Sequence, residues 1–280
     1  MSISVENSQE IDPLMVPTRE AWENMSPVER RQKEMSIIAA LEQESSLMGE
    51  TTIHFESRAS ATEVLRRFFQ GKGRTAFIAS DLHTLYPGER AFYPDLLVVF
   101  DVETHHRRSW NVMREGRGLD FALEILSRET RRKDRVEKLN LYMRIEIPEY
   151  FIFDPDLFSL KGYRLIQQIY QEIPPEDGKI FSQILGLYLK VEADKLRFSV
   201  PDGLEVPFAY ELVEQLNQKL LHKERIIEDY ARDLDEEYQR AEDEKQRAED
   251  EKQRAEAEKQ RADKAEAELQ RLRQLLDLKK

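Results

Sequence analysis

Two apolar stretches, FYPDLLVVF at residues 92–100 and DFALEIL at residues 120–126, decide the fold of this chain. Each has the length of a strand and is rich in branched and aromatic side chains, so each predicts a buried β-strand. Each stretch also contains an acid. Asp95 stands directly before LLVVF in the first stretch, and Glu124 lies within the second. A carboxylate buried without a partner is costly, so Glu124 in particular requires one.

Helices and further strands are predicted on both sides of these stretches. Ser26, Pro27 and Glu29 form a capping box that starts a helix, and its apolar stripe ends near Gly49. The other predicted helices cover residues 58–70 and 129–145, and the other predicted strands cover residues 74–80, 150–153, 163–169, 184–191 and 195–200. This mixture predicts an α/β domain from residue 26 to residue 205.

Residues 1–25 and residues 206–280 differ in character from that domain. The first segment is polar, contains Pro13 and Pro17 and shows no periodicity, so it predicts an N-terminal tail. The second has no Gly or Pro after Pro207 and repeats the heptad AEDEKQR, which predicts one long charged helix. Its heptad seam is apolar at both ends but glutamate-rich in the middle, so a coiled coil and a solitary helix both fit.

Composition excludes several classes of protein and site. The 280 residues include no cysteine, which excludes disulfide scaffolds, thiol nucleophiles, iron–sulfur clusters and cysteine-ligated zinc. Any metal must therefore be held by oxygen or imidazole. The sequence also has no apolar run long enough to span a membrane and no signal peptide at its start, so we expect a soluble cytoplasmic protein without a membrane partner.

The charge of one segment contrasts with that of the whole chain. The formal net charge is −12, yet residues 104–144 hold eleven Arg or Lys against six acids. Such a basic segment fits a surface that faces phosphate groups, and it equally fits the solvated faces of helices and loops. Charge alone leaves both readings open.

Two acids and one lysine form the candidate site. A single acid in a strand is most simply a salt-bridged core residue. Two acids on adjacent strands, Asp95 and Glu124, also fit a divalent cation held by oxygen ligands, with phosphate completing its shell. Asp134, Lys138 and Tyr142 follow one another at intervals of four and share a helical face, so the Lys138 ammonium can point back toward the acids. The ring of Tyr142 can equally pack on the sheet.

Residues 107–155, which include DFALEIL and DRVEKLNLYMRIEIPEYFIFDP, resemble the Uma2 family of restriction-type endonucleases within the PD-(D/E)XK nuclease superfamily. Residues 80–100 are similar to the first acidic segment of that family, and residues 162–203 to its closing hairpins. The resemblance implies a restriction-endonuclease-like fold with a central mixed sheet flanked by helices. It also implies dependence on Mg²⁺ and hydrolysis of DNA phosphodiester bonds.

The resemblance also assigns roles to residues. Asp95 takes the place of the superfamily's PD aspartate and Glu124 that of its second acid, both as metal ligands. The superfamily places a lysine two residues after the second acid, where this chain has Leu126. Lys138 matches the lysine of the family's next helix and takes the catalytic role, and Asp81 in the upstream acidic segment is a further candidate metal ligand.

Two functions remain open from the sequence. In the first, the chain is a Mg²⁺-dependent endonuclease, with Mn²⁺ as a substitute, in which metal-activated water hydrolyses DNA. In the second, the domain has lost activity and is a DNA- or protein-binding scaffold that oligomerises through the helical tail. The two acids with Lys138 favour the first function, and Leu126 favours the second. A homo-oligomer, formed through the sheet domain or the tail, is compatible with either.

Overall fold

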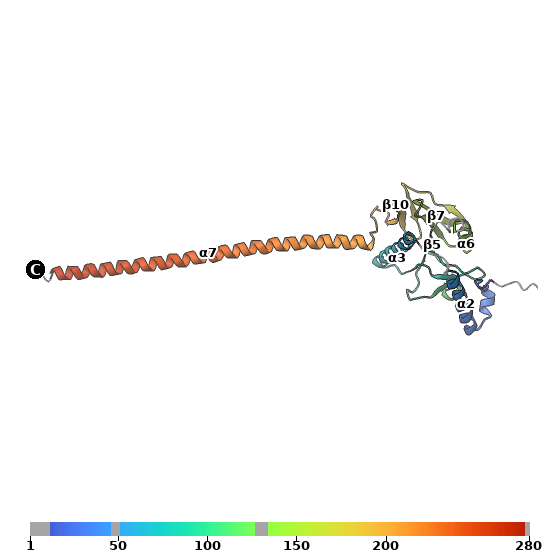
Figure 1. Ribbon diagram of the computed structural model, residues 1–280, viewed down its shortest axis with the longest axis horizontal. Helices are drawn as coiled ribbons and strands as arrows, with labels where there is room; N and C mark the ends of the chain where they lie inside the picture. The colour runs from blue at the N-terminus through green and yellow to red at the C-terminus, as the bar shows by residue number, and fades with distance from the viewer. Residues whose placement is uncertain (1–11, 46–50, 127–133, 278–280) are drawn as a thin grey trace, which may run out of the picture. The chain divides into compact units, whose positions relative to one another are not determined.

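The computed structural model describes residues 12–45, 51–126 and 134–277, and its α/β unit contains a six-stranded mixed sheet (Figure 1). Its strands lie in the order β1-β3-β5-β6-β7-β8; β5 and β6 are parallel, and the other neighbours are antiparallel. The strands are Ala76–Ala79 (β1), Leu96–Phe100 (β3), Phe121–Ile125 (β5), Glu149–Asp154 (β6), Ser159–Ile166 (β7) and Ile169–Glu172 (β8). The fold is therefore mixed α/β, as the sequence predicts.

Two smaller sheets accompany the central one. An antiparallel sheet contains Lys179–Ser182 (β9), Leu187–Glu192 (β10) and Lys195–Ser199 (β11), and a parallel pair contains His83–Leu85 (β2) and Ser109–Asn111 (β4). Sequence patterns identify β10 and β11 but miss the other three strands. Three or four residues are too few for the alternation of apolar and polar side chains to stand out.

The helices of the domain start and end near recognisable signals. They are Arg19–Glu23 (α1), Pro27–Ser45 (α2), Thr52–Lys72 (α3), Val112–Glu115 (α4), the π-helical turn Asp134–Lys138 (η1) and Leu139–Arg144 (α6). The predicted capping box is present, because Ser26 N–H donates to Glu29 Oε2 at 2.8 Å. α3 starts earlier than predicted, after its N-cap Thr51, and ends at Gly73, which has a φ of 66°. Residues 129–133 of the predicted third helix lie outside the described residues.

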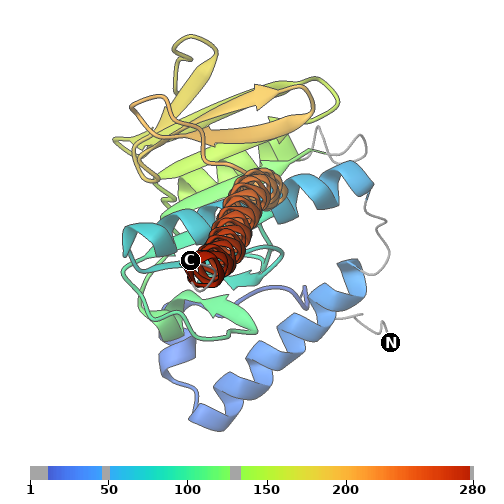
Figure 2. The same cartoon turned by 90° about the vertical axis from the view of Figure 1, so that its left-hand side faces the viewer.

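Strand β5 is buried on both faces and separates two apolar clusters. Phe121, Leu123 and Ile125 belong to the cluster built with α3, which crosses the sheet (Figure 2), and with the β9–β11 sheet. Ala122 belongs to the opposite cluster, built with β4 and α6. Side chains alternate along a strand, so Glu124 leaves β5 on the same face as Ala122.

Residues 12–25 are part of the folded domain, so the predicted N-terminal tail is wrong for this segment. Leu14 and Val16 are buried in a third apolar cluster together with residues of α2, and Trp22 of α1 is also buried. The apolar run at residues 14–16 is too short to indicate a helix or a strand, and it becomes part of a core by packing with the stripe of α2 and with other distant residues. Residues 1–11 of the predicted tail lie outside the described residues.

The predicted strand at residues 163–169 is a hairpin instead. β7 ends at Ile166 and β8 begins at Ile169, while Gln167 and Gln168 between them have φ values of 49° and 63°. Glycine or asparagine usually marks a turn in this left-handed region. Two glutamines between apolar residues therefore conceal the turn from sequence reasoning.

Glu34 joins α2 to β4 and α4. Its carboxylate accepts hydrogen bonds from Ser109 Oγ at 2.5 Å, Asn111 Nδ2 at 3.3 Å and Arg114 Nη1 at 2.6 Å. Glu34→Ala would deprive these donors, two of them fully buried, of their acceptor. We expect the free energy of unfolding, measured by urea denaturation, to fall by about 2 kcal/mol. The control Gln32→Ala removes an exposed side chain of the same helix and should have little effect; equal effects in both variants would contradict this role of Glu34.

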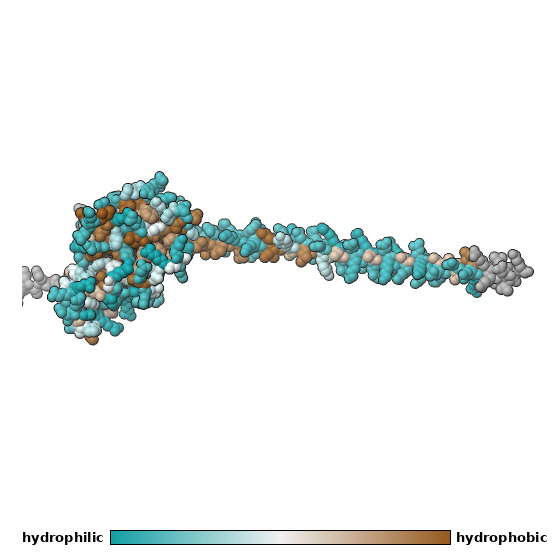
Figure 3. Space-filling model, turned by 180° about the vertical axis from the view of Figure 1, so that it is seen from behind, coloured by the Kyte–Doolittle hydropathy of each residue, from teal (hydrophilic) through white to brown (hydrophobic). Residues whose placement is uncertain are grey.

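The described part of the chain's second unit, Val213–Lys280, belongs to one long helix. That helix, Ala209–Asp277 (α7), runs for 69 residues without a break and confirms the predicted long helix. Apolar side chains gather along its first part, and most of the remainder is polar (Figure 3). Within the described ranges, no helix combines the length and the apolar character needed to cross a membrane.

Candidate active site

Asp95 directly precedes β3, and Glu124 lies in the neighbouring antiparallel strand β5. Leu96 of β3 pairs with Leu123 of β5, and continuing this register by one residue sets Asp95 across from Glu124. Side chains opposite each other in such a pair leave the same face of the sheet, with Cβ atoms about 5 Å apart. Glu124 is 1% exposed and Asp95 is 8% exposed, so both acids are buried.

Two donors hold the Asp95 carboxylate. Ile125 N–H donates to Oδ2 at 2.6 Å, and His54 Nε2 lies 3.3 Å from the same oxygen. Burial raises the pKa of Asp95, but the hydrogen bond from His54, the charge of Lys138 and the backbone amide together lower it by more. The pKa therefore lies below its ordinary value, and Asp95 is an anion at neutral pH.

Two donors from the next helical segment hold the Glu124 carboxylate. Lys138 Nζ donates to Oε2 at 2.5 Å, and Tyr142 OH donates to Oε1 at 2.5 Å. Lys138 ends η1 and Tyr142 lies one turn later in α6, so the four-residue spacing brings both to one face. Burial and the charge of Glu124 raise the pKa of Tyr142 well above its ordinary value, so the hydroxyl stays protonated and donates.

Solvent reaches this group from the side of the lysine. The exposed fraction of the side chain is 25% for Lys138, 12% for Asp95 and 1% for Glu124. An anionic ligand that enters from solvent therefore meets the ammonium group before it meets the deepest carboxylate. Such an arrangement lets a phosphate approach two acids that would otherwise repel it.

Asp81, the third predicted acid, is engaged elsewhere. Its carboxylate pairs with Arg58 of α3. Within residues 12–45, 51–126 and 134–277, no three His, Cys, Asp or Glu side chains gather as a metal-binding group. The structure thus brings Asp95, Glu124 and Lys138 together and does not add Asp81 to them.

The described arginines of the basic segment, residues 104–144, are largely compensated by acids of the same domain. Ion pairs join Arg107 with Glu115, Arg114 with Glu34, Arg117 with Asp120, and Arg144 with Glu89. Acids of the same domain therefore balance the charge of these four arginines. This favours solvated surface residues over a surface that faces phosphate groups. Residues 127–133 of the segment lie outside the described residues.

Sequence comparison assigns the chain to a family. The Uma2 family model, described as "Putative restriction endonuclease", matches residues 43–193, which is more than half of the chain. This chain belongs to the Uma2 family. The match confirms the resemblance seen in the sequence, and its range contains Asp95, Glu124 and Lys138.

Comparison with solved structures matches this Uma2 protein to a "putative nuclease belonging to DUF820" from Anabaena variabilis ATCC 29413. The two chains are 16% identical, with a TM-score of 0.43, and the match covers 52% of this chain and 82% of the other. No curated protein is similar enough in sequence to be matched.

The amine beside Glu124 comes from the following helical segment and not from residue 126. Leu126, two residues after Glu124, is 1% exposed and belongs to the apolar cluster that contains Trp110 and Tyr142. An ammonium group at that position would sit among apolar side chains at a large desolvation cost. Lys138 instead brings the amine to Glu124 from the following helical segment.

Sequence patterns did not reveal the contact between His54 and Asp95. The helix start predicted at residue 58 excludes His54, whereas Thr51 is the N-cap in the structure and its hydroxyl accepts from His54 N–H at 3.4 Å. Thr51 was the signal in the sequence for this earlier helix start, because threonine is a preferred N-cap residue. It would have placed His54 and Arg58 four residues apart on one face, where they contact an acid each.

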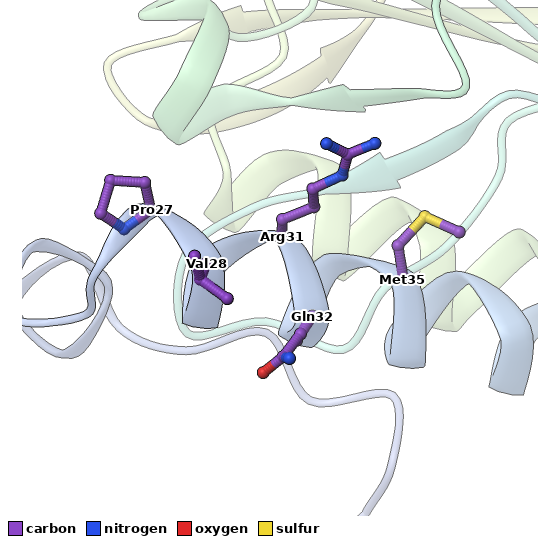
Figure 4. Close-up of a pocket in the computed structure, with 5 residues that line it drawn as sticks. All are labelled: Pro27, Val28, Arg31, Gln32 and Met35. Atoms are coloured by element: carbon purple, nitrogen blue, oxygen red, sulfur yellow. The ribbon is translucent and has the colours of Figure 1, made fainter.

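A surface hollow on α2 shares no residue with this group (Figure 4). Its lining residues are Pro27, Val28, Arg31, Gln32 and Met35. None of them is an acid or a histidine, so the hollow has no group that would bind a metal or act as a general base.

Asp95 and Glu124 fit a hard divalent cation such as Mg²⁺. Proteins commonly bind Mg²⁺ through one or two carboxylates, and water and substrate phosphate complete its six ligands. Here one carboxylate comes from β5 and the other from the residue directly before β3, and donors on each of them, including His54 and Tyr142, hold them in place.

Proposed function

We propose that this Uma2 protein is a Mg²⁺-dependent endonuclease that hydrolyses DNA phosphodiester bonds at the centre formed by Asp95, Glu124 and Lys138. The observation that carries the proposal is the position of two buried acids across one strand pair, with the Lys138 ammonium on one of them. Membership of a family described as restriction endonucleases supports DNA as the substrate.

Asp95 and Glu124 would hold the cation. When bound, Mg²⁺ supplies Lewis-acid chemistry, because it polarises the scissile phosphate and lowers the pKa of coordinated water. Asp95 is ready for this role because its lowered pKa keeps it ionised at neutral pH. Mn²⁺ prefers similar oxygen ligands and should substitute.

The surrounding side chains position the acids and balance charge. Tyr142, protonated and fully buried, donates to Glu124 and restricts the rotation of its carboxylate. Lys138 lies at the solvent side of the group, where its ammonium can stabilise the negative charge that develops on an attacked phosphate. No side chain has to act as a nucleophile, because water attacks the phosphate.

The second candidate function is a nuclease-like scaffold that binds DNA or protein without cleaving it. The buried Leu126 at the usual lysine position is the observation that favours it. The two functions differ in two requirements, since a scaffold needs neither Mg²⁺ nor a charged Lys138.

Incubation of the purified intact chain with supercoiled plasmid DNA tests the proposal. We expect nicked and linear products with Mg²⁺ or Mn²⁺ and none with EDTA. Glu124→Gln protein, purified in the same way, controls for contaminating nucleases and should give no product. Absence of cleavage under all conditions, or equal cleavage by both proteins, would contradict the endonuclease, and DNA binding without cleavage would support the scaffold.

A further inference from the structure

α7 carries a heptad seam that is apolar near both ends of the helix. With Val213 at position a of a heptad, apolar residues recur at a and, near both ends of the helix, at d. The large ones are Val213, Leu216, Leu220, Ile227, Tyr230, Leu234, Leu269 and Leu272, and each is between 51% and 72% exposed in the single chain. Figure 3 shows the apolar side chains gathered on the first part of this helix. An exposed apolar face of this extent is typical of an interaction surface.

We propose that α7 pairs with α7 of a second copy of this chain as an antiparallel coiled coil, with Val213 opposite Leu272. A second copy fits as the partner because its helix has two apolar ends with the same separation. Each apolar end of one helix can therefore cover the opposite end of the other helix. The inference does not depend on the proposed nuclease activity.

A parallel pair in register would set like charges against each other. Four d positions would place glutamate against glutamate: Glu237, Glu244, Glu251 and Glu258. Three of the flanking contacts between positions g and e would also join like charges: Arg240 with Lys245, Arg247 with Lys252, and Arg254 with Lys259. Like charges at these positions oppose pairing, so the charge pattern disfavours the parallel arrangement.

The antiparallel pair removes these repulsions from the seam. Positions a and d then face each other, so Leu216 meets Leu269 of the second copy and the apolar ends cover each other. The four glutamates at d now face apolar side chains: Glu258 faces Ile227, Glu251 faces Leu234, Glu244 faces Ala241, and Glu237 faces Ala248. A glutamate beside an apolar residue can turn its carboxylate to solvent, which it cannot do as effectively against a second glutamate.

The flanking charges also agree with the antiparallel register. In this arrangement g faces g and e faces e. Opposite charges meet in three contacts: Lys219 with Glu268, Glu224 with Lys259, and Asp233 with Arg254. One contact, Arg240 with Arg247, joins like charges. The parallel pair has as many attractive flanking contacts, but it has three repulsive contacts where the antiparallel pair has one.

The antiparallel pair has a consequence for the attached domains. Residues 213 to 272 of a helix extend over about 90 Å at 1.5 Å per residue. The two helices therefore start at opposite ends of the pair, and each start carries one α/β domain. A parallel pair would attach both domains at the same end.

Cysteine cross-linking distinguishes the two arrangements, because the natural chain has no cysteine. Leu216→Cys and Leu269→Cys full-length chains, co-expressed and oxidised, should form a disulfide-linked dimer on a non-reducing gel. Each variant alone should remain unlinked, because its two cysteines would lie about 80 Å apart, whereas a disulfide needs Cα atoms about 6 Å apart. A dimer from either variant alone would overturn the antiparallel arrangement.

Sedimentation equilibrium of charge variants provides an independent test. The intact chain should show twice its mass of 33.1 kDa, and a mass of one chain at every concentration would overturn the pairing. Lys219→Glu or Glu268→Lys alone should raise the dissociation constant about fivefold, and the double variant should restore it. In the parallel pair Lys219 faces Glu224, so there the double variant would be the weakest. Glu249→Lys at position b, with the same charge change as Glu268→Lys, should leave the constant unchanged.

Discussion

Asp95→Asn is expected to reduce Mg²⁺-dependent plasmid cleavage by about 100-fold or more, because it removes the charge from one of the two oxygen ligands. The asparagine carbonyl can still accept the hydrogen bond from Ile125 N–H, so we expect the fold to persist. The measurement is the initial rate of nicking of supercoiled plasmid at several Mg²⁺ concentrations, together with the circular dichroism spectrum of the variant.

Asp81→Asn is the matched control for this prediction. It neutralises the other acid that the sequence singles out, whose carboxylate pairs with Arg58. Asparagine tolerates the left-handed backbone of residue 81, which has a φ of 49°. We expect cleavage close to that of the unchanged chain. An equal loss in both variants would place Asp81 in the site, and full activity in Asp95→Asn would rule out the proposed centre.

Lys138→Met is expected to affect both stability and cleavage. It leaves the Glu124 carboxylate, which is 1% exposed, without the ammonium group that compensates its charge. Removing one partner of such a buried pair lowers the free energy of unfolding by about 3 kcal/mol. Loss of the ammonium should also reduce cleavage by about 100-fold. Urea denaturation and the plasmid assay measure the two effects separately.

The double variant Glu124→Gln/Lys138→Met separates the structural role of the lysine from its catalytic role. With both charges removed, Tyr142 can still donate to the glutamine oxygen, so most of the lost stability should return. Cleavage should stay absent. Stability losses that simply add in the double variant would show that Glu124 and Lys138 are not coupled, and recovered cleavage would exclude a catalytic role for Lys138.

The central strands and their acids were predictable because their signals are local. FYPDLLVVF and DFALEIL contain strands β3 and β5, and their acids Asp95 and Glu124 stand out against apolar neighbours. The position of Lys138 was also accessible, since it lies four residues before Tyr142 on one helical face and both contact Glu124. Each of these inferences uses a period of two or of about 3.6 residues, which a few consecutive residues reveal.

Other parts of the structure depend on contacts that no local period records. Leu14 and Val16 belong to a three-residue apolar run in a polar segment, and they become part of a core through contacts with α2 and other distant residues. The turn at Gln167 and Gln168 contains none of the usual turn residues. The pairing of β7 with β8 imposes its conformation. Three-residue strands such as β2 and β4 exist because their partners lie beside them.

Local sequence was sufficient to predict the mixed α/β class, the two acids beside the central strands, the lysine of the next helical segment and the long heptad helix, because each arises from neighbouring residues and their spacing. Long-range packing was needed to set Asp95 across from Glu124, to bring His54 to Asp95 and to pair Asp81 with Arg58. Strand register and helix packing follow from burial of the whole apolar surface, to which residues far apart in the chain contribute together.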